Sequence, residues 1–193
     1  CVSRSIGDQS SGCGRRGAMF ACEASGVVPD IITLSKALTG GTLPLAATVA
    51  RERIFRAFWS DDESAALMHG PTYMANPLAC AAALASLELF ETEPRVERAA
   101  AMERPLREGL EPLRGAPGVV DVRARGALAV VEVERAGQAP LLRQRFIERG
   151  VWVRPLGRSI YLCPPLVATD EDLAVLTEAV RNVVLSSADA LTA

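Results

Sequence analysis

Residues 30–41 read Asp30-Ile31-Ile32-Thr33-Leu34-Ser35-Lys36-Ala37-Leu38-Thr39-Gly40-Gly41. The short β-branched run Ile31–Leu34 follows a Pro-Asp turn and predicts a buried strand. Lys36 stands at the end of this strand, and Gly40-Gly41 predicts a turn whose backbone can pass close to a flat ligand. Ligands of an α/β sheet bind beyond the carboxyl ends of its strands, so a primary amine stands where a ligand would lie.

Lys36 is the only lysine in a chain that contains 21 Lys and Arg residues together. Elsewhere the chain supplies positive charge as arginine. A guanidinium cannot form an imine with an aldehyde, whereas a primary amine can, so the exception at position 36 suggests amine chemistry. Composition alone leaves a chance surface lysine equally open, and the setting between a strand and paired glycines favours the chemical role.

The flanking segments continue an alternation of strands and helices. Residues 1–17 show no sustained apolar period and predict a loop, residues 45–49 predict a second buried strand, and residues 52–58 a short helix. Asn76-Pro77 is typical of a helix start, because Asn caps exposed amides and Pro needs no donor in the first turn. The helix behind it is expected to bury a stripe of apolar residues: Leu78, Ala81, Ala82, Ala85 and Leu89.

The order of elements changes near residue 94. The pattern beyond it predicts a helix over 95–113, strands over 119–122 and 128–133, a helix over 140–149 that ends at a left-handed Gly150, and strands over 151–153 and 159–162. A capping-box variant, Thr169 with Asp172, predicts the last helix, whose buried side carries Leu173, Leu176, Val180 and Val184. We therefore expect two domains, residues 1–94 and residues 95–193.

Two further segments carry candidate binding groups. Residues 69–79 place a Gly-Pro-Thr turn ahead of a helix start, where free amides and the helix dipole suit a phosphate, although such a turn is commonly only a turn. Arg154 follows an apolar strand, and its planar fork suits a carboxylate, although a structural ion pair is the simpler explanation of it alone. His69, the only histidine, is expected to be structural.

Composition excludes several classes of protein. The net charge of −2 argues against a nucleic-acid partner, and no apolar run is long enough for a membrane-spanning helix or a signal peptide. The five cysteines lack paired metal-ligand spacing, so we expect no metal and reduced, buried structural thiols in a cytoplasmic protein.

Residues 30–41 resemble the cofactor-lysine motif of the class III aminotransferases. The resemblance implies the carboxyl-terminal part of the type I pyridoxal-phosphate fold: part of a large α/β domain followed by a small α+β domain. It further implies that Lys36 anchors pyridoxal 5'-phosphate as an imine and later moves protons between the substrate and the cofactor.

Residues 69–79 and 150–165 resemble the family members that convert 8-amino-7-oxononanoate to 7,8-diaminononanoate in biotin synthesis, with S-adenosylmethionine as amino donor. By this resemblance, Pro71 and Thr72 bind the cofactor phosphate across the interface of a homodimer, and Gly70 contacts substrate. Arg154 would hold the substrate carboxylate, with Tyr161 on the same side of the pocket.

The resemblance fails at the amino terminus. The family aspartate that pairs with the cofactor's ring nitrogen falls on Gly7, with Asp8 one place late, so residues 1–11 are atypical. Family members are also roughly twice as long, so we expect an incomplete enzyme with little turnover of its own. Two alternatives stay open: another class III ω-aminotransferase, and a catalytically silent fragment kept for dimerisation or cofactor holding.

Overall fold

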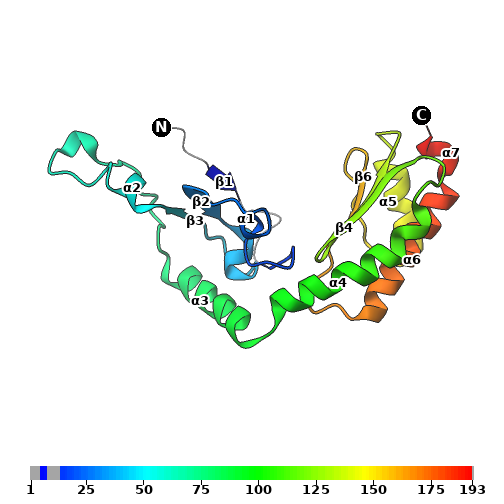
Figure 1. Ribbon diagram of the computed structural model, residues 1–193, viewed down its shortest axis with the longest axis horizontal. Helices are drawn as coiled ribbons and strands as arrows, with labels where there is room; N and C mark the ends of the chain where they lie inside the picture. Colours follow the sequence, from blue (N-terminus) through cyan, green and yellow to red (C-terminus); the bar gives the residue numbers. More distant parts are fainter. Residues whose placement is uncertain (1–4, 8–13, 193) are drawn as a thin grey trace. The chain divides into compact units, whose positions relative to one another are not determined.

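A computed structural model describes residues 5–7 and 14–192. The chain forms two compact units, which are described separately below (Figure 1). Unit 1 comprises Cys1–Gly14 and Ala18–Arg95, and unit 2 comprises Arg15–Gly17 and Val96–Ala193. Both units contain helices and strands, in agreement with the α/β fold class expected from the sequence.

The sheet of unit 1 has the order β1-β2-β3. Strand β2 (Ile31–Leu34) pairs in parallel with β1 (Ser5–Gly7) and antiparallel with β3 (Ala47–Ala50). The prediction of a loop over residues 1–17 is therefore wrong at β1. A three-residue strand has no apolar period of its own, and it forms through its pairing with β2. β2 and β3 confirm the predicted strands, but β2 is only half-buried and β3 is largely exposed.

The described residues of unit 1 also form five short or medium helices. Asn76 caps the longest, α3 (Pro77–Thr92), because its Oδ1 accepts hydrogen bonds from the amides of Leu78 and Ala79, as the sequence predicted. The predicted buried stripe of α3 is wrong: Ala79 and Ala83 are buried, whereas Leu78 is 71% exposed. The other helices are α1 (Ala21–Ala24), η1 (Lys36–Thr39), α2 (Glu52–Phe55) and η2 (Glu63–Ala65).

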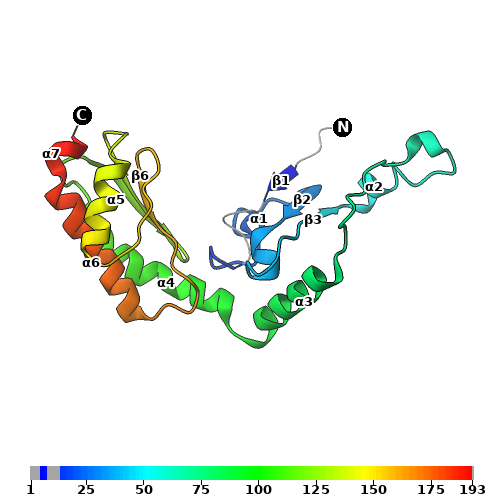
Figure 2. The same ribbon diagram turned by 180° about the vertical axis from the view of Figure 1, so that it is seen from behind.

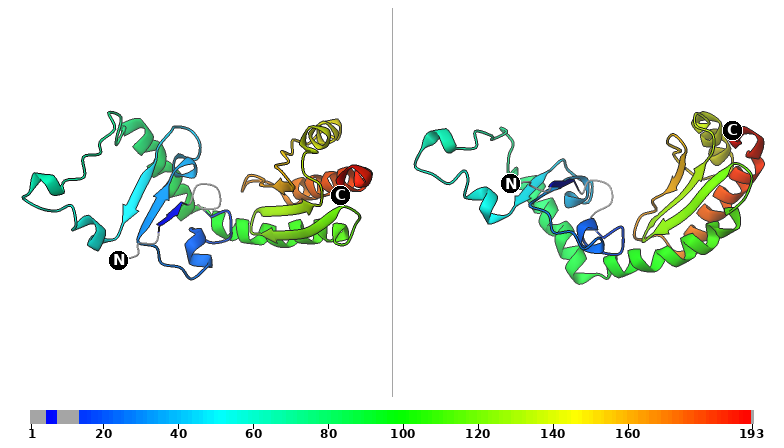
Figure 3. Two further views of the ribbon diagram at one scale, coloured as in Figure 1. Left: turned by 90° about the horizontal axis from the view of Figure 1, so that it is seen from above. Right: turned by 45° about the horizontal axis from the view of Figure 1, so that its top comes forward.

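Unit 2 is an antiparallel sheet with its helices on one face (Figures 2 and 3). The strands are β4 (Val119–Arg125), β5 (Leu128–Val133) and β6 (Ser159–Leu162), in the order β4-β5-β6. The helices are α4 (Arg95–Leu110), η3 (Glu111–Leu113), α5 (Ala139–Glu148), α6 (Asp170–Ser186) and α7 (Ala188–Leu191).

Local signals in unit 2 act as predicted. Gly150 has a φ of 74° directly after α5, and the side chains of Thr169 and Asp172 form the capping box of α6. The hydrogen bonds that Asp172 accepts from the amide and hydroxyl of Thr169 lower the pKa of that carboxyl. Residues 151–153 do not form the predicted strand: the segment pairs with no strand of the described chain, and nearby only Leu156 bridges to Ser159.

The hydrophobic core lies in unit 2. Alternate residues of β5 and β6 point toward the helices, so their apolar side chains are buried against α4, α5 and α6. In the described part of unit 1, by contrast, Ala79 and Ala83 are the only buried hydrophobic residues. The largest buried side chains are Phe146, Met102, Leu106, Leu110, Leu113, Leu142, Ile160, Leu173 and Leu191.

Gly109 of α4 marks the tightest helix contact of this core. A Cβ added at Gly109 would lie 2.5 Å from Oγ1 of Thr177, whose hydroxyl already donates to the carbonyl of Leu173. We expect Gly109→Ala to destabilise unit 2 by about 1–3 kcal/mol through overpacking, although alanine is the better helix former. Denaturant unfolding would measure the change.

The matched control is the double variant Gly109→Ala/Thr177→Ala, which removes the clashing atoms. It should be more stable than the sum of the two single variants predicts, because the clash is then absent. Additive losses would contradict this explanation of the contact.

The helices of the described residues offer no membrane span, because none of them combines the required length with the required hydrophobicity.

Candidate active site

Lys36 opens η1 directly after β2, which confirms the predicted position of the amine at the carboxyl end of a strand. The side chain is exposed. Its amine forms no hydrogen bond and no ion pair with any residue in the described part of the chain. An amine free of such partners is available to react with an aldehyde.

An open cavity of about 520 Å³ lies beside this amine. Its volume falls within the range of about 300–1,000 Å³ that small-molecule and cofactor sites occupy. Ser35 and Lys36 line it, together with residues of the loop that follows η1. The lining residues are Ser35, Lys36, Gly41, Thr42, Leu43, Pro44, Leu45 and Ala46.

The paired glycines shape this loop as the sequence predicted. Gly40 and Gly41 have φ angles of 61° and 85°, which residues other than glycine rarely adopt. The hydroxyl of Thr39 donates to the carbonyl of Leu43 at 2.6 Å, and the hydroxyl of Thr42 donates to the carbonyl of Thr39 at 2.8 Å. Sequence reasoning missed Thr39. The available signal was a hydroxyl residue directly before two glycines, and the structure adds that this residue is buried.

The parallel strand β1 ends at the same sheet edge as β2. Gly7 pairs with Thr33, so the chain leaves β1 at the carboxyl edge from which Lys36 emerges. This is the position at which the family resemblance expects an aspartate for the ring nitrogen of the cofactor. Gly7 supplies no carboxylate, and Asp8 lies outside the described residues.

The predicted phosphate turn is exposed and precedes α3, as expected, but its electrostatics differ from the prediction. Pro77 has no backbone N–H group, and the N–H groups of Leu78 and Ala79 donate to Oδ1 of Asn76. The start of α3 therefore offers no free N–H donor. A phosphate here would depend on the turn itself and on the hydroxyl of Thr72.

Gly70, Pro71 and Thr72 do not line the Lys36 cavity of the same chain. All three are exposed to solvent, and around them the backbone makes local bonds such as that from the amide of Met74 to the carbonyl of Pro71, at 2.9 Å. The structure therefore does not bring the turn to the lysine within one copy of the described chain.

Arg154 and Tyr161 belong to unit 2. Tyr161 stands in β6 opposite Val130 of β5 and is half-buried. The guanidinium of Arg154 is exposed and has no ion pair or hydrogen bond with any described residue, so the structural ion pair considered from the sequence is absent there. An arginine without a protein partner is available for an external carboxylate.

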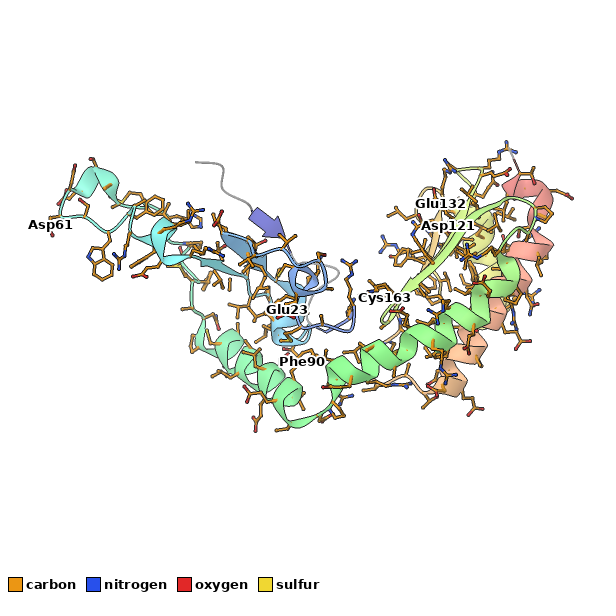
Figure 4. The ribbon with its side chains drawn as sticks, in the orientation of Figure 1. Glu23, Asp61, Phe90, Asp121, Glu132 and Cys163 are labelled. Atoms are coloured by element: carbon orange, nitrogen blue, oxygen red, sulfur yellow. The ribbon has the colours of Figure 1, made fainter. Side chains whose placement is uncertain are left out.

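Two arginines near Arg154 are paired, whereas Arg125 of β4 resembles Arg154 in having no partner among the described residues. Arg123 donates to Asp121 at 2.8 Å and to Glu132 at 3.0 Å; Figure 4 shows the two carboxylates close together on the sheet. The hydrogen bond from Arg123 lowers the pKa of the Asp121 carboxyl. Arg158 donates to the carbonyl of Val133. Arg123 and Arg158 are therefore held within the protein, and Arg154 is one of several exposed arginines of unit 2 without a partner among the described residues.

The described cysteines, Cys22, Cys80 and Cys163, are free thiols. They are half-buried, so the expectation of fully buried thiols is wrong for these three. Cys163 follows β6 and accepts a hydrogen bond from Arg15 at 3.1 Å. Cys1 and Cys13 lie outside the described residues.

Comparison with known proteins places this geometry in a family. The profile of the class III aminotransferases matches residues 9–184. The adenosylmethionine-8-amino-7-oxononanoate aminotransferase of Corynebacterium glutamicum is 41% identical over 179 residues, which are 93% of this chain and 42% of that protein. The enzyme of the same name from Mycobacterium leprae is 42% identical, over 90% of this chain and 40% of its own length. The chain thus spans about two fifths of these relatives.

Solved structures agree. The adenosylmethionine-8-amino-7-oxononanoate aminotransferase of Methanocaldococcus jannaschii is 35% identical, with a TM-score of 0.85 over 93% of this chain and 44% of its own. An (S)-enantioselective omega-transaminase from Thermomicrobium roseum is 31% identical, with a TM-score of 0.88 over 96% of this chain and 43% of its own. The fold is therefore part of the fold of these transaminases.

Proposed function

The chain belongs to the class III aminotransferase family, and we propose that it is part of a cytoplasmic pyridoxal-phosphate enzyme that transfers an amino group to 8-amino-7-oxononanoate in biotin synthesis. Because the chain spans 42% of its relative from Corynebacterium glutamicum, the activity proposed is that of the whole enzyme. The observation that carries the proposal is the free amine of Lys36, which faces an open cavity at the end of β2.

The residues around Lys36 fit the cofactor. The cavity has the volume of a cofactor site, and glycine at position 41 leaves one wall without a side chain, so that a flat ring can approach the backbone. Bound pyridoxal phosphate supplies an electron-accepting pyridine ring. Lys36 would hold the cofactor by condensing with its aldehyde, with loss of water, and once displaced by substrate its amine would carry the proton that leaves the substrate Cα.

Chemical trapping tests this assignment. Pyridoxal phosphate is added to the chain, the mixture is reduced with borohydride, and the modified peptide is identified by mass spectrometry. We expect the label on Lys36 and its absence from the Lys36→Arg variant, since a guanidinium forms no imine. A whole, cofactor-loaded enzyme that stays unlabelled at Lys36 would exclude the proposed function.

Arg154 supports a substrate with a carboxylate. Its guanidinium is exposed and free of described partners, and Tyr161 follows seven residues later in strand β6. We propose that Arg154 orients the carboxylate of 8-amino-7-oxononanoate, that Tyr161 and Gly70 contact the same substrate, and that S-adenosylmethionine is the donor. The names of the relatives from Corynebacterium glutamicum and Mycobacterium leprae support both substrates.

A second copy of the chain completes the proposed site. Pro71 and Thr72 lie outside the cavity of their own chain, and we propose that they bind the cofactor phosphate in the site of a partner copy. Residues 58–74, the segment that carries Pro71 and Thr72, expose large apolar side chains. Among them, Trp59 is 74% exposed and Met68 is 87% exposed. An exposed apolar segment of this kind is typical of a protein interface.

Mixed dimers test the sharing of the site. In the whole enzyme, Lys36→Arg and Thr72→Asp should each remove activity, the second because a carboxylate repels the phosphate. If Thr72 acts across the interface, random mixing of the two variants should restore about a quarter of the parental activity, because half of the dimers then hold one intact site. No recovery would show that Thr72 serves its own chain.

An ω-aminotransferase with another substrate is the second candidate. The similarity to the omega-transaminase of Thermomicrobium roseum, with a TM-score of 0.88, favours it. The free Arg154 is the discriminating residue, because it suits an acceptor with a carboxylate. A screen of amino donors and acceptors with the whole enzyme separates the candidates: turnover of S-adenosylmethionine with 8-amino-7-oxononanoate supports the first.

A further inference from the structure

We propose that Thr39 is a positioning residue of the Lys36 site: the buried hydroxyl of Thr39 fixes the loop that lines the cavity together with Lys36. The inference rests on the proposed role of Lys36 and adds to it the group that shapes the binding space. Thr39 is the last residue of η1, and Lys36 is the first.

The contacts of Thr39 close a small ring of hydrogen bonds. Its hydroxyl donates to the carbonyl of Leu43 at 2.6 Å. Its own carbonyl accepts from the hydroxyl of Thr42 at 2.8 Å and from the amide of Thr42 at 3.2 Å. The ring encloses Gly40 and Gly41, and its members Gly41, Thr42 and Leu43 line the cavity.

Burial distinguishes Thr39 from its surroundings. It is 2% exposed, whereas residues 40–44 that follow it are all exposed. Paired glycines sample many backbone conformations, so an exposed loop built on them needs a fixed point to keep one shape. In unit 1 the hydroxyl of Thr39 is the buried donor that supplies this point, in a region with little hydrophobic core.

The other end of the turn is fixed independently. The hydroxyl of Ser86 in α3 donates to the carbonyl of Ala37 at 3.4 Å, so α3 supports η1 at Ala37 while Thr39 ties η1 to the cavity loop. Loss of the Thr39 hydroxyl should therefore release the wall of the cavity and leave the attachment of η1 to α3 intact. A mobile wall orders the cofactor less well and weakens its binding.

Three variants of the full chain test the role. Thr39→Val keeps the shape of the side chain and removes the hydroxyl, Thr39→Ser keeps the hydroxyl, and Thr48→Val makes the same exchange at an exposed residue of β3 that forms no side-chain hydrogen bond with a described residue. The measurement is the concentration of pyridoxal phosphate at which half of Lys36 is trapped by borohydride. The pH at which the absorbance of the Lys36 imine changes serves as a second readout.

We expect Thr39→Val to require about tenfold more cofactor and to shift the pH of the absorbance change, as the loss of one buried hydrogen bond predicts. Thr39→Ser and Thr48→Val should behave as the parent does. Parental trapping by Thr39→Val, or an equal loss in Thr39→Ser, would overturn the positioning role while leaving the function of Lys36 intact. A parent chain unlabelled at Lys36 would overturn both.

Discussion

Replacement of Lys36 by alanine should lower transamination by the whole enzyme by at least about a thousandfold, because the variant loses both the covalent attachment and the proton carrier. The effect is chemical and not structural. Lys36 is exposed and forms no ion pair or hydrogen bond with the described residues. The free energy of unfolding should therefore change by no more than about 0.5 kcal/mol.

Added primary amines provide the control for this variant. A small alkylamine can enter the open cavity beside position 36 and accept the proton that Lys36 would have carried. We expect a partial rescue of Lys36→Ala that increases with the concentration of the free base. Lys36→Arg should resist the same treatment, since its side chain fills the space. Full activity of either variant without added amine would contradict the assignment of Lys36.

Replacement of Arg154 by glutamine should lower kcat/KM for the carboxylate-bearing acceptor by about a hundredfold, which corresponds to about 3 kcal/mol for a bidentate charged contact. Most of the loss should be in KM, because the carboxylate is distant from the reacting ketone and binds alike before and during the reaction. An acceptor that lacks the carboxylate should lose little. Steady-state kinetics with the matched pair of acceptors measure both effects.

Arg158→Gln is the matched control, four residues along the same segment. Its guanidinium already donates to the carbonyl of Val133 at 2.8 Å and lies 3.8 Å from a carboxylate oxygen of Glu132. We expect a modest loss of stability and an unchanged KM for the acceptor. If Arg158→Gln raised KM as strongly as Arg154→Gln, the carboxylate would not be bound specifically by Arg154.

The residues of the candidate site were predictable where the chemistry depends on a local setting. The only lysine, a strand before it and two glycines after it are adjacent in sequence, and in the structure Lys36 and Gly41 line the same cavity. The relation of Thr72 to Lys36 was not predictable in this way. That relation depends on the path of the chain over the more than thirty residues between Lys36 and Thr72. The roles of Pro71, Thr72, Gly70, Arg154 and Tyr161 stay predictions.

Burial was the least predictable property of unit 1. Residues 45–49 are apolar enough for a buried strand, but β3 is largely exposed because no described element packs against it. On α3 the apolar residues surround the helix, so their spacing could not select the buried face, which Ala79 and Ala83 provide. In unit 2, where one face of the sheet is covered, the strands predicted over residues 128–133 and 159–162 form, and burial alternates along both of them.

The sequence by itself determined the helix starts at Asn76 and Thr169, the left-handed Gly150 and the position of the Lys36 amine at the end of a strand, because each depends on neighbours within a few residues. Only the tertiary structure decided that Ser5–Gly7 forms a strand and that residues 151–153 do not. A strand exists through hydrogen bonds to a partner strand, and that partner is chosen by the fold and not by the residues of the strand alone.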